Sequence, residues 1–189
     1  QRQMCIRDST GGVNLLPSGR NFFGLDPRVL PTKAAWELGK RLGNQVIEQY
    51  IADEGKYPEN IGMVFWSGSN MRSHGQCIAE FLYFMGFKPV WEKGSLQVKR
   101  LEVIPLSELM RPRIDVTARI SGLFRDTMPT VVELLDKAVL LAADLNELED
   151  DNYIKKHISE ESSLMEKSGM THEESWRNAA YRIFGDAPG

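Results

Sequence analysis

The spacing of apolar residues along the chain predicts an alternating order of helices and strands. After Thr32, apolar side chains recur every three or four positions as far as Tyr50, which predicts a helix over about 32–54 with Thr32 as its N-cap. The apolar run at 61–66 does not alternate with polar residues. We therefore expect a strand there that is buried on both faces, as in a parallel sheet.

The middle of the chain continues in the same order. An apolar helical pattern covers about 73–85, with Gly86 as its C-cap, and short strands are expected at 87–91 and 98–104. Residues 114–120 alternate between apolar and polar side chains. This alternation predicts a third strand, one face of which is polar or lines a cavity.

Helical patterns dominate the last third of the chain. One helix is expected to begin near Thr127, with Pro129 in its first turn and a wide apolar stripe after it. More polar helices are expected at 151–167 and 172–183. This order of elements predicts an α/β fold: a Rossmann-like layered domain with a mostly parallel sheet, followed by a helical extension.

Changes in pattern divide the chain into three parts. Residues 1–14 are an off-pattern leader, which we expect to be non-native or disordered because its first eight residues look like translated adaptor sequence. Residues 15–146 form the expected α/β core. Residues 147–189 form the helical extension, which we expect to be truncated at its C-terminus.

Composition is that of an ordinary soluble protein, with 42% apolar and 26% charged residues. Every apolar run is shorter than the roughly 18 residues of a membrane span, so no membrane span is expected. The two cysteines, Cys5 and Cys77, are too few for a disulfide framework. A reducing, cytoplasmic location is therefore expected.

The net charge of −3 is unevenly distributed, because residues 144–174 carry −7 and the remainder carries +4. The basic remainder has no lysine or arginine run and no interleaved aromatic residues, which argues against nucleic acid as a partner. Its arginines suit a small polyanion, such as a macrocycle edged with carboxylates. The chain also lacks the motifs of a phosphate-binding loop, a dinucleotide site and a serine hydrolase.

The polar groups most suited to a ligand lie in a proline-punctuated segment at 16–28. Prolines reduce the entropy of a free loop, and the helix that follows offers unsatisfied N–H groups and a positive dipole end to an anion. The candidate residues of this segment are Arg20, Asn21, Asp26 and Arg28. Asp26 would orient Arg28 or cap the following helix. The alternative is a structured linker with surface arginines.

Two Ser/Gly turns repeat this arrangement where predicted strands end. The turn at 67–75 carries Asn70 and Arg72, and the turn at 121–127 carries Arg125 and Asp126. The carboxyl ends of strands are where an α/β domain places its ligand groups. Arg125 either faces the same crevice or pairs locally with Asp126, and both readings stay open.

Other conspicuous residues are more simply structural. Trp66 ends a predicted buried strand and is more typical of a core than of a surface that stacks on a ligand. Arg111 and Arg113 precede the third strand, at the wrong end for a carboxyl-end crevice, which favours a structural or docking role. His74 and Cys77 are three residues apart, a spacing that suits a soft metal, but a partly exposed imidazole and a buried thiol are the favoured reading.

His157 and His172 lie in the acidic helical part, without a convergent partner in the sequence pattern. With His74 and Cys77 set aside as well, we predict no metal site. No catalytic residue is assigned, because none of the candidates stands out as an acid or a base.

Several motifs, in order, resemble one family. They are G-R-N-F-F-G-L-D-P-R, P-T-K-A-A-W-E-L-G, W-S-G-S-N-M-R-S-H-G, L-S-E-L-M-R-P-R-I-D-V, I-S-G-L-F-R-D and Y-R-I-F-G-D-A-P-G. From about Leu15 to Gly189 the chain resembles the large, tetrapyrrole-binding subunit of the ATP-dependent metal chelatases. The family contains the cobaltochelatase large subunit and the magnesium chelatase H subunit. Its members are very long chains, so the resemblance implies a fragment from the C-terminal half of such a subunit.

The resemblance implies the function of the whole enzyme. A cobaltochelatase inserts its substrate Co²⁺ into hydrogenobyrinic acid a,c-diamide in cobalamin (vitamin B12) biosynthesis, while an AAA+ ATPase motor subunit and a further accessory subunit hydrolyse ATP. One alternative is a magnesium chelatase H subunit that inserts Mg²⁺ into protoporphyrin IX. Another is a non-catalytic module that binds tetrapyrrole or docks the motor. The isolated fragment is expected to be inactive.

The resemblance also implies a set of substrate-binding residues. The positions that match the family's motifs are Arg20, Asn21, Asp26, Arg28, Asn70, Arg72, Arg125 and Asp126. Metal insertion requires a base for the ring N–H protons, for which Asp26 and Asp126 are the only candidates, and neither is assigned as catalytic. The first motif looks closer to the cobalt type, whereas N-Y-I-K-K-H at 152–157 looks closer to the magnesium type.

Overall fold

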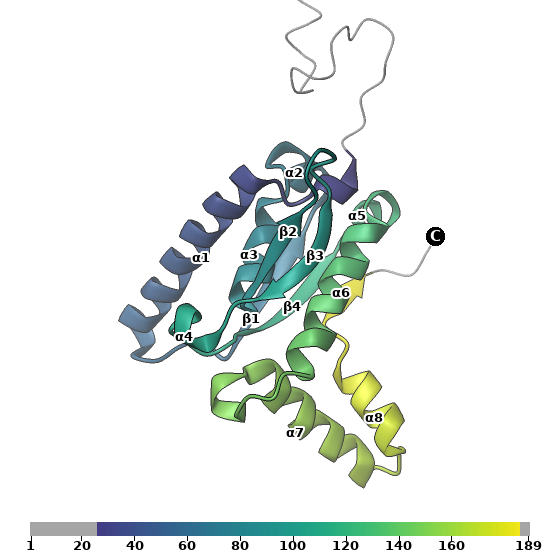
Figure 1. Ribbon diagram of the computed structural model, residues 1–189. Helices are drawn as coiled ribbons and strands as arrows, with labels where there is room; N and C mark the ends of the chain where they lie inside the picture. The colour runs from purple at the N-terminus through teal and green to yellow at the C-terminus, as the bar shows by residue number, and fades with distance from the viewer. Residues whose placement is uncertain (1–25, 186–189) are drawn as a thin grey trace, which may run out of the picture.

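A three-stranded parallel sheet forms the centre of the structure, a computed structural model that describes residues 26–185 (Figure 1). Its strands lie in the order β1 (Asn60–Phe65), β4 (Asp115–Ile120) and β5 (Ile183–Gly185). An antiparallel pair, β2 (Phe87–Trp91) and β3 (Val98–Val103), forms a second sheet. The predicted α/β class with a parallel sheet is confirmed.

Helices account for most of the other described residues. The longer helices are α1 (Lys33–Glu54), α3 (Gln76–Phe84), α6 (Pro129–Ala143), α7 (Tyr153–Lys167) and α8 (His172–Ala179). The shorter ones are η2 (Pro27–Val29), α2 (Ser67–Arg72), α4 (Leu106–Leu109), α5 (Gly122–Thr127) and η3 (Glu149–Asp151). Within residues 26–185, no helix is long and apolar enough to cross a membrane.

Helix α1 begins and ends as its sequence predicts, and it packs closely on α3. The Thr32 hydroxyl accepts a hydrogen bond from the Ala35 N–H, and Gly55 ends the helix in the left-handed conformation. Two glycines one turn apart face α3. A Cβ at Gly39 would come within 2.6 Å of the Cβ of Ala79, and Gly43 lies similarly close to Tyr83. Only glycine permits this close approach of the two helices.

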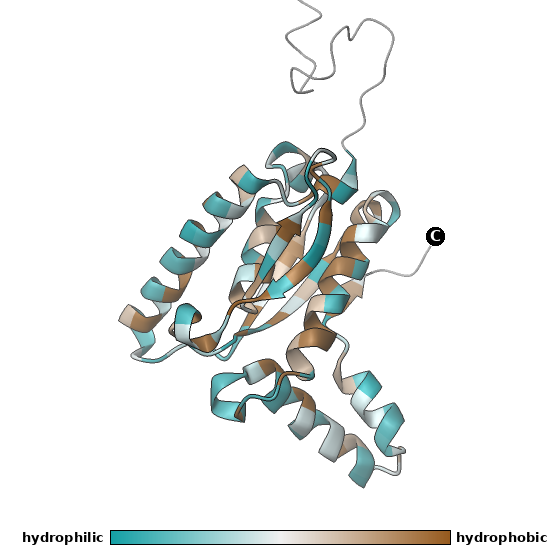
Figure 2. Ribbon diagram, in the orientation of Figure 1, coloured by the Kyte–Doolittle hydropathy of each residue, from teal (hydrophilic) through white to brown (hydrophobic). Residues whose placement is uncertain are grey.

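The two faces of the parallel sheet differ in burial. On one face, Phe65 of β1 makes edge-to-face contacts with Phe81 of α3 and Phe124 of α5, with ring centroids 6.1 and 5.5 Å apart. Val116 and Ile120 of β4 lie on the same buried face. Figure 2 shows the apolar residues of these strands and of the inward sides of α3 and α6. The main core therefore lies between this face and the helices.

The other face of β1 contradicts the expectation that this strand is buried on both sides. Its exposure alternates along the strand, and Val64 is 54% exposed. The reason is topological: within residues 26–185, β1 lies at the edge of the sheet. An unbroken apolar run therefore does not correspond here to a central strand.

Three local expectations also need correction. The predicted turns at 67–75 and 121–127 contain the short helices α2 and α5. The helix predicted at 172–183 ends at Ala179, and residues 183–185 form β5, which pairs with β4. A three-residue strand leaves no periodicity to detect, so tertiary pairing decides its conformation.

At the amino end of β4, a buried arginine joins several elements. Arg113 is fully buried, and its Nε and Nη2 donate to the two carboxylate oxygens of Glu147 at 2.7 and 2.8 Å. Nη1 donates to the carbonyls of Met85 and Gly86, and Nη2 also donates to that of Ile104. The structural role predicted for this arginine is confirmed.

Replacing Arg113 by alanine removes the charged partner of the Glu147 carboxylate, which is only 14% exposed, and one donor to each of three carbonyls. We expect the free energy of unfolding to fall by about 3–5 kcal/mol, measured by urea denaturation. Arg100→Ala, which removes an exposed arginine from β3, should change it by less than about 0.5 kcal/mol. Equal effects of the two substitutions would contradict the role given to Arg113.

Candidate functional site

The carboxyl ends of β1 and β4 bring two of the predicted polar segments together. Helix α2 begins directly after β1 and α5 directly after β4, at the same edge of the sheet (Figure 1). The hydroxyls of Ser67 and Thr127 are hydrogen-bonded across the two helices, with 2.8 Å between their oxygens. The sequence prediction that these segments share one edge is confirmed.

The third polar segment is held by Asp26 and Arg28. The Asp26 carboxylate accepts hydrogen bonds from the backbone N–H and the Nε of Arg28, each at 3.0 Å, and thereby caps η2. Arg28 hydrogen-bonds to this carboxylate and lowers the pKa of Asp26. Asp26 therefore both orients Arg28 and caps a helix. Arg20 and Asn21 lie outside the described residues.

A second contact fixes Asp26 against the β2–β3 hairpin. The Gln97 side chain donates to the Asp26 carboxylate at 3.2 Å. Nearby, the indole N–H of Trp91 donates to the carbonyl of Pro31 at 2.8 Å. These bonds hold the segment that precedes α1 against the hairpin, while the Arg28 side chain remains 60% exposed.

The two candidate residues of α2 differ in accessibility. Asn70 is fully buried, and its amide nitrogen donates to the carbonyl of Trp66 at 3.1 Å. Its amide oxygen has no hydrogen-bond partner among residues 26–185. Arg72, in contrast, is exposed. Arg72 is therefore accessible to solvent, whereas Asn70 is bonded to the residue that precedes α2.

Arg125 and Asp126 form an ion pair on α5. The Nε of Arg125 lies 2.9 Å from a carboxylate oxygen of Asp126, and the two side chains are 27% and 62% exposed. The local pairing that the sequence left open therefore occurs, at the same sheet edge as α2.

Sequence reasoning missed two residues at this edge. Trp66 was expected in the core, but it is 62% exposed, because it follows an edge strand rather than a central one. Arg119 occupies an exposed polar position near the end of β4. The alternation at 114–120 was the signal for this position, since it predicted a polar face.

At the amino end of the sheet, His157 has partners that the sequence pattern did not reveal. Its Nδ1 lies 2.8 Å from a carboxylate oxygen of buried Asp115, which also accepts two hydrogen bonds from the Nε of Arg182. The Nε2 of His157 lies 3.7 Å from the Glu59 carboxylate. The expectation that His157 has no convergent partner is wrong, because these residues are far apart in the sequence.

The residues considered for a metal do not converge. Within the described chain, no group of three or more His, Cys, Asp or Glu side chains could hold a metal ion. His74 is exposed, and Cys77 is half-buried, with its thiol pKa raised by burial.

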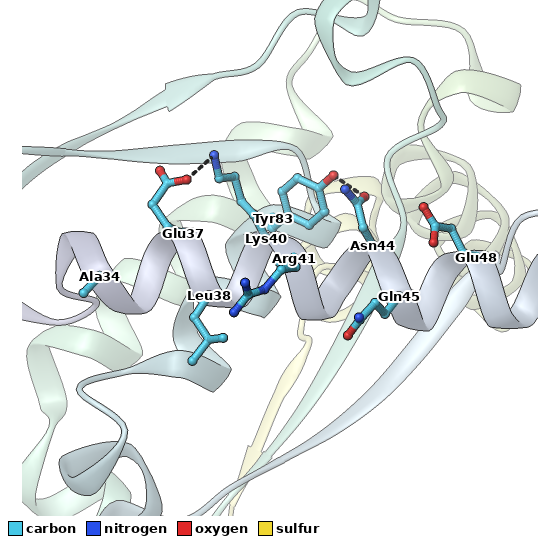
Figure 3. A pocket seen from close by; sticks show the side chains of 9 residues that line it. All are labelled: Ala34, Glu37, Leu38, Lys40, Arg41, Asn44, Gln45, Glu48 and Tyr83. Atoms are coloured by element: carbon cyan, nitrogen blue, oxygen red, sulfur yellow. Dashed lines mark hydrogen bonds and ion pairs between the residues drawn. The ribbon is translucent and has the colours of Figure 1, made fainter.

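A hollow among the described residues lies elsewhere. It has a volume of about 900 Å³ and follows the outer side of α1 (Figure 3). Glu37 and Lys40 form an ion pair there, and the Tyr83 hydroxyl donates to the Asn44 side chain. None of the candidate residues lines it. Shape alone therefore does not identify the site.

Comparison with known proteins identifies the family. The CobN/Magnesium Chelatase family model matches residues 7–189, which is nearly the whole chain. The chain belongs to this family. The matched range begins inside the segment 1–14 that the sequence pattern set apart.

Similar proteins include cobaltochelatase subunits and magnesium-chelatase subunits. The aerobic cobaltochelatase subunit CobN of a Sinorhizobium species is 44% identical over 95% of this chain and 14% of its own length. The magnesium-chelatase subunit ChlH of Oryza sativa subsp. indica is 39% identical over 96% of this chain and 13% of its own length. The chain thus spans about one seventh of these relatives.

A solved structure supports the fold as well. The catalytic subunit of cobaltochelatase from Mycobacterium tuberculosis matches with a TM-score of 0.81 and 42% identity, over 90% of this chain and 14% of that one. The arrangement of sheet and helices described above is therefore that of a chelatase subunit segment.

The pairing of His157 with Asp115 makes stability depend on pH. The hydrogen bond that protonated His157 donates to the Asp115 carboxylate raises the pKa of His157 above its ordinary value of 6.5, against the opposing effect of burial. The folded state binds this proton more tightly than the unfolded state. The contribution of the pairing to the free energy of unfolding is therefore complete below about pH 6.5 and is lost as the pH rises through the folded-state pKa.

His157→Asn should therefore flatten the decline of the unfolding free energy as the pH rises from about 6.5 through the folded-state pKa of His157. Urea denaturation at several pH values measures this slope. His74→Asn, at an exposed histidine in the left-handed conformation, should keep the wild-type profile. Parallel profiles for wild type and His157→Asn would contradict the assignment.

Proposed function

We propose that this chain is a segment of a metal-chelatase large subunit and that its carboxyl edge forms part of the tetrapyrrole site. The observation that carries the proposal is the shared position of α2 and α5, joined by the bond between Ser67 and Thr127. Exposed Arg72 and the ion-paired Arg125 lie on these two helices. Membership of the CobN/Magnesium Chelatase family supports it.

We further propose that the substrates are Co²⁺ and hydrogenobyrinic acid a,c-diamide, in cobalamin biosynthesis. Identity to the CobN sequence from Sinorhizobium is 44%, against 39% for the rice ChlH sequence. The matching solved structure is also that of a cobaltochelatase subunit. The alternative is Mg²⁺ insertion into protoporphyrin IX, which the ChlH relative supports.

The chemistry suited to this edge is the binding of substrate carboxylates. A guanidinium group binds a carboxylate through two parallel hydrogen bonds. Arg28 is held in place by Asp26 while remaining largely exposed. Asp26 and Asp126 are each committed to an arginine, so neither is proposed as the base that removes the ring N–H protons.

The complete enzyme would need partner subunits that supply the energy for metal insertion. We propose an AAA+ ATPase motor subunit and an accessory subunit, which hydrolyse ATP and act on the large subunit in the cytoplasm. Deforming a macrocycle and stripping water from the metal ion require such an input. A module that binds tetrapyrrole or docks the motor without chemistry remains the second candidate for this segment.

Ligand preference tests the substrate assignment. We expect the complete subunit to bind hydrogenobyrinic acid a,c-diamide more tightly than protoporphyrin IX, measured by quenching of tryptophan fluorescence. Preference for protoporphyrin IX would move the protein to the magnesium branch. Binding of neither ring would overturn the tetrapyrrole function.

Arginine substitutions test the role of the edge. In the complete subunit, Arg20→Ala and Arg28→Ala should each weaken binding of the preferred ring by roughly tenfold, the value of a charge-assisted hydrogen bond. Arg41→Ala, on the outer side of α1, is the matched control. Lost turnover with unchanged affinity would exclude a purely binding role, and unchanged turnover and affinity would overturn the arginine site.

A further inference from the structure

Residues 26–185 cover only part of the face of the parallel sheet that lies opposite the main core. Asp115, at the amino end of this face, contacts His157 of α7 and Arg182. Toward the carboxyl end, Val64, Arg119 and Phe184 lie side by side on three neighbouring strands, according to the strand register. Val64 is 54% exposed, Phe184 is 52% exposed, and Arg119 is exposed.

Two further residues extend this open surface. Trp66 follows β1 in an extended conformation, so it lies on the same side as Val64, and it is 62% exposed. A Cβ added at Gly62 would meet nothing within 4 Å, which confirms that the face is open at β1 as well. At about 4.8 Å between neighbouring strands, the surface is about 10 Å wide.

The surface combines apolar and aromatic area with one cation. Arg119 makes no hydrogen bond or ion pair among residues 26–185. If another part of the protein covered it with apolar side chains, its charge would be buried without a partner, which is strongly unfavourable. A flat ring that carries carboxylates matches both the apolar area and the charge of this surface. The ring would cover Trp66, Val64 and Phe184, and a carboxylate would pair with Arg119.

We infer that the surface formed by Val64, Trp66, Arg119 and Phe184 binds one face of the tetrapyrrole, with Arg119 as the partner of a ring carboxylate. This inference rests on the proposed function and assigns residues outside the expected substrate-binding set. Trp66 and Phe184 lie within motifs that resemble the family, whereas Val64 and Arg119 do not. The surface adjoins the edge that carries Arg72 and Arg125, because Trp66 immediately precedes α2 and β4 leads into α5.

Substitutions at Arg119 test the carboxylate contact in the complete subunit. With hydrogenobyrinic acid a,c-diamide and protoporphyrin IX as probes, Arg119→Ala should raise the Kd of the preferred ring by roughly tenfold or more. Arg119→Lys should recover part of the loss, because it keeps the charge but not the fork of donors. Arg100→Ala removes another exposed arginine, from β3, and should leave the Kd unchanged.

Fluorescence of Trp66 tests whether the ring contacts this surface or whether another part of the protein covers it. Trp66→Phe should remove more of the ligand-dependent quenching than Trp36→Phe, because Trp66 is 62% exposed whereas Trp36 is buried. Acrylamide should quench Trp66 in the ligand-free subunit and should quench it less once the ring is bound. If Trp66 is inaccessible to acrylamide before ligand is added, another part of the protein covers the surface and the inference is overturned.

The outcomes separate this inference from the proposed function. If the wild-type subunit binds a ring and Arg119→Ala binds it as tightly as Arg100→Ala does, only the surface assignment fails. If the wild-type subunit binds neither ring, the proposed function and the surface assignment fail together.

Discussion

The burial of Arg113 is the constraint on which the rest of the structure depends. A guanidinium group has five N–H donors, and Arg113 makes five hydrogen bonds within the protein. They reach the end of α3, the end of the β2–β3 hairpin and the loop that follows α6. A charge can remain in such a site only if every donor is paired and a counter-charge is close. Glu147 supplies that charge, so the relative positions of these elements are fixed by one side chain. Gly86 is required beside it, because a Cβ there would overlap the Arg113 guanidinium.

The two ends of the parallel sheet therefore have different roles. At the amino end, Asp115, His157 and Arg182 form a second buried polar group of residues, which attaches α7 and the segment before β5 to β4. Most polar side chains at this end are committed to one another. At the carboxyl end, Arg28 and Arg125 are more exposed, and each forms an ion pair with a near neighbour in the sequence, Asp26 and Asp126. Such local pairs can exchange one carboxylate for another without disturbing the core, which suits a site that binds anions.

Sequence patterns predicted the elements better than their surroundings. The helix of α1, both hairpin strands and the shared edge of the two Ser/Gly turns could be predicted, because capping residues and apolar periodicity act locally. The exposure of Trp66 could not be predicted, since the same apolar run is compatible with an edge strand and with a central strand. The partners of Asp115 lie 42 and 67 residues away, so no local pattern could reveal them. The structural role of Arg113 could be predicted from its place before a strand, although its five acceptors could not. For the candidate site, Arg28, Arg72 and Arg125 followed from motifs, whereas Arg119 required the register of the sheet.

The relatives also indicate where metal and ring specificity can reside. CobN and ChlH sequences match nearly the whole of this chain, 95% and 96% of it, so a common fold serves proteins named for two metals. The buried amino end is an unsuitable place for discrimination, because changing a residue such as Arg113 would destabilise the fold. Exposed positions at the carboxyl end can change without that penalty. Differences between cobalt and magnesium members within this segment are therefore expected among side chains at the carboxyl edge and on the open sheet face, where a change alters the fit of a ring and its carboxylates but not the packing beneath.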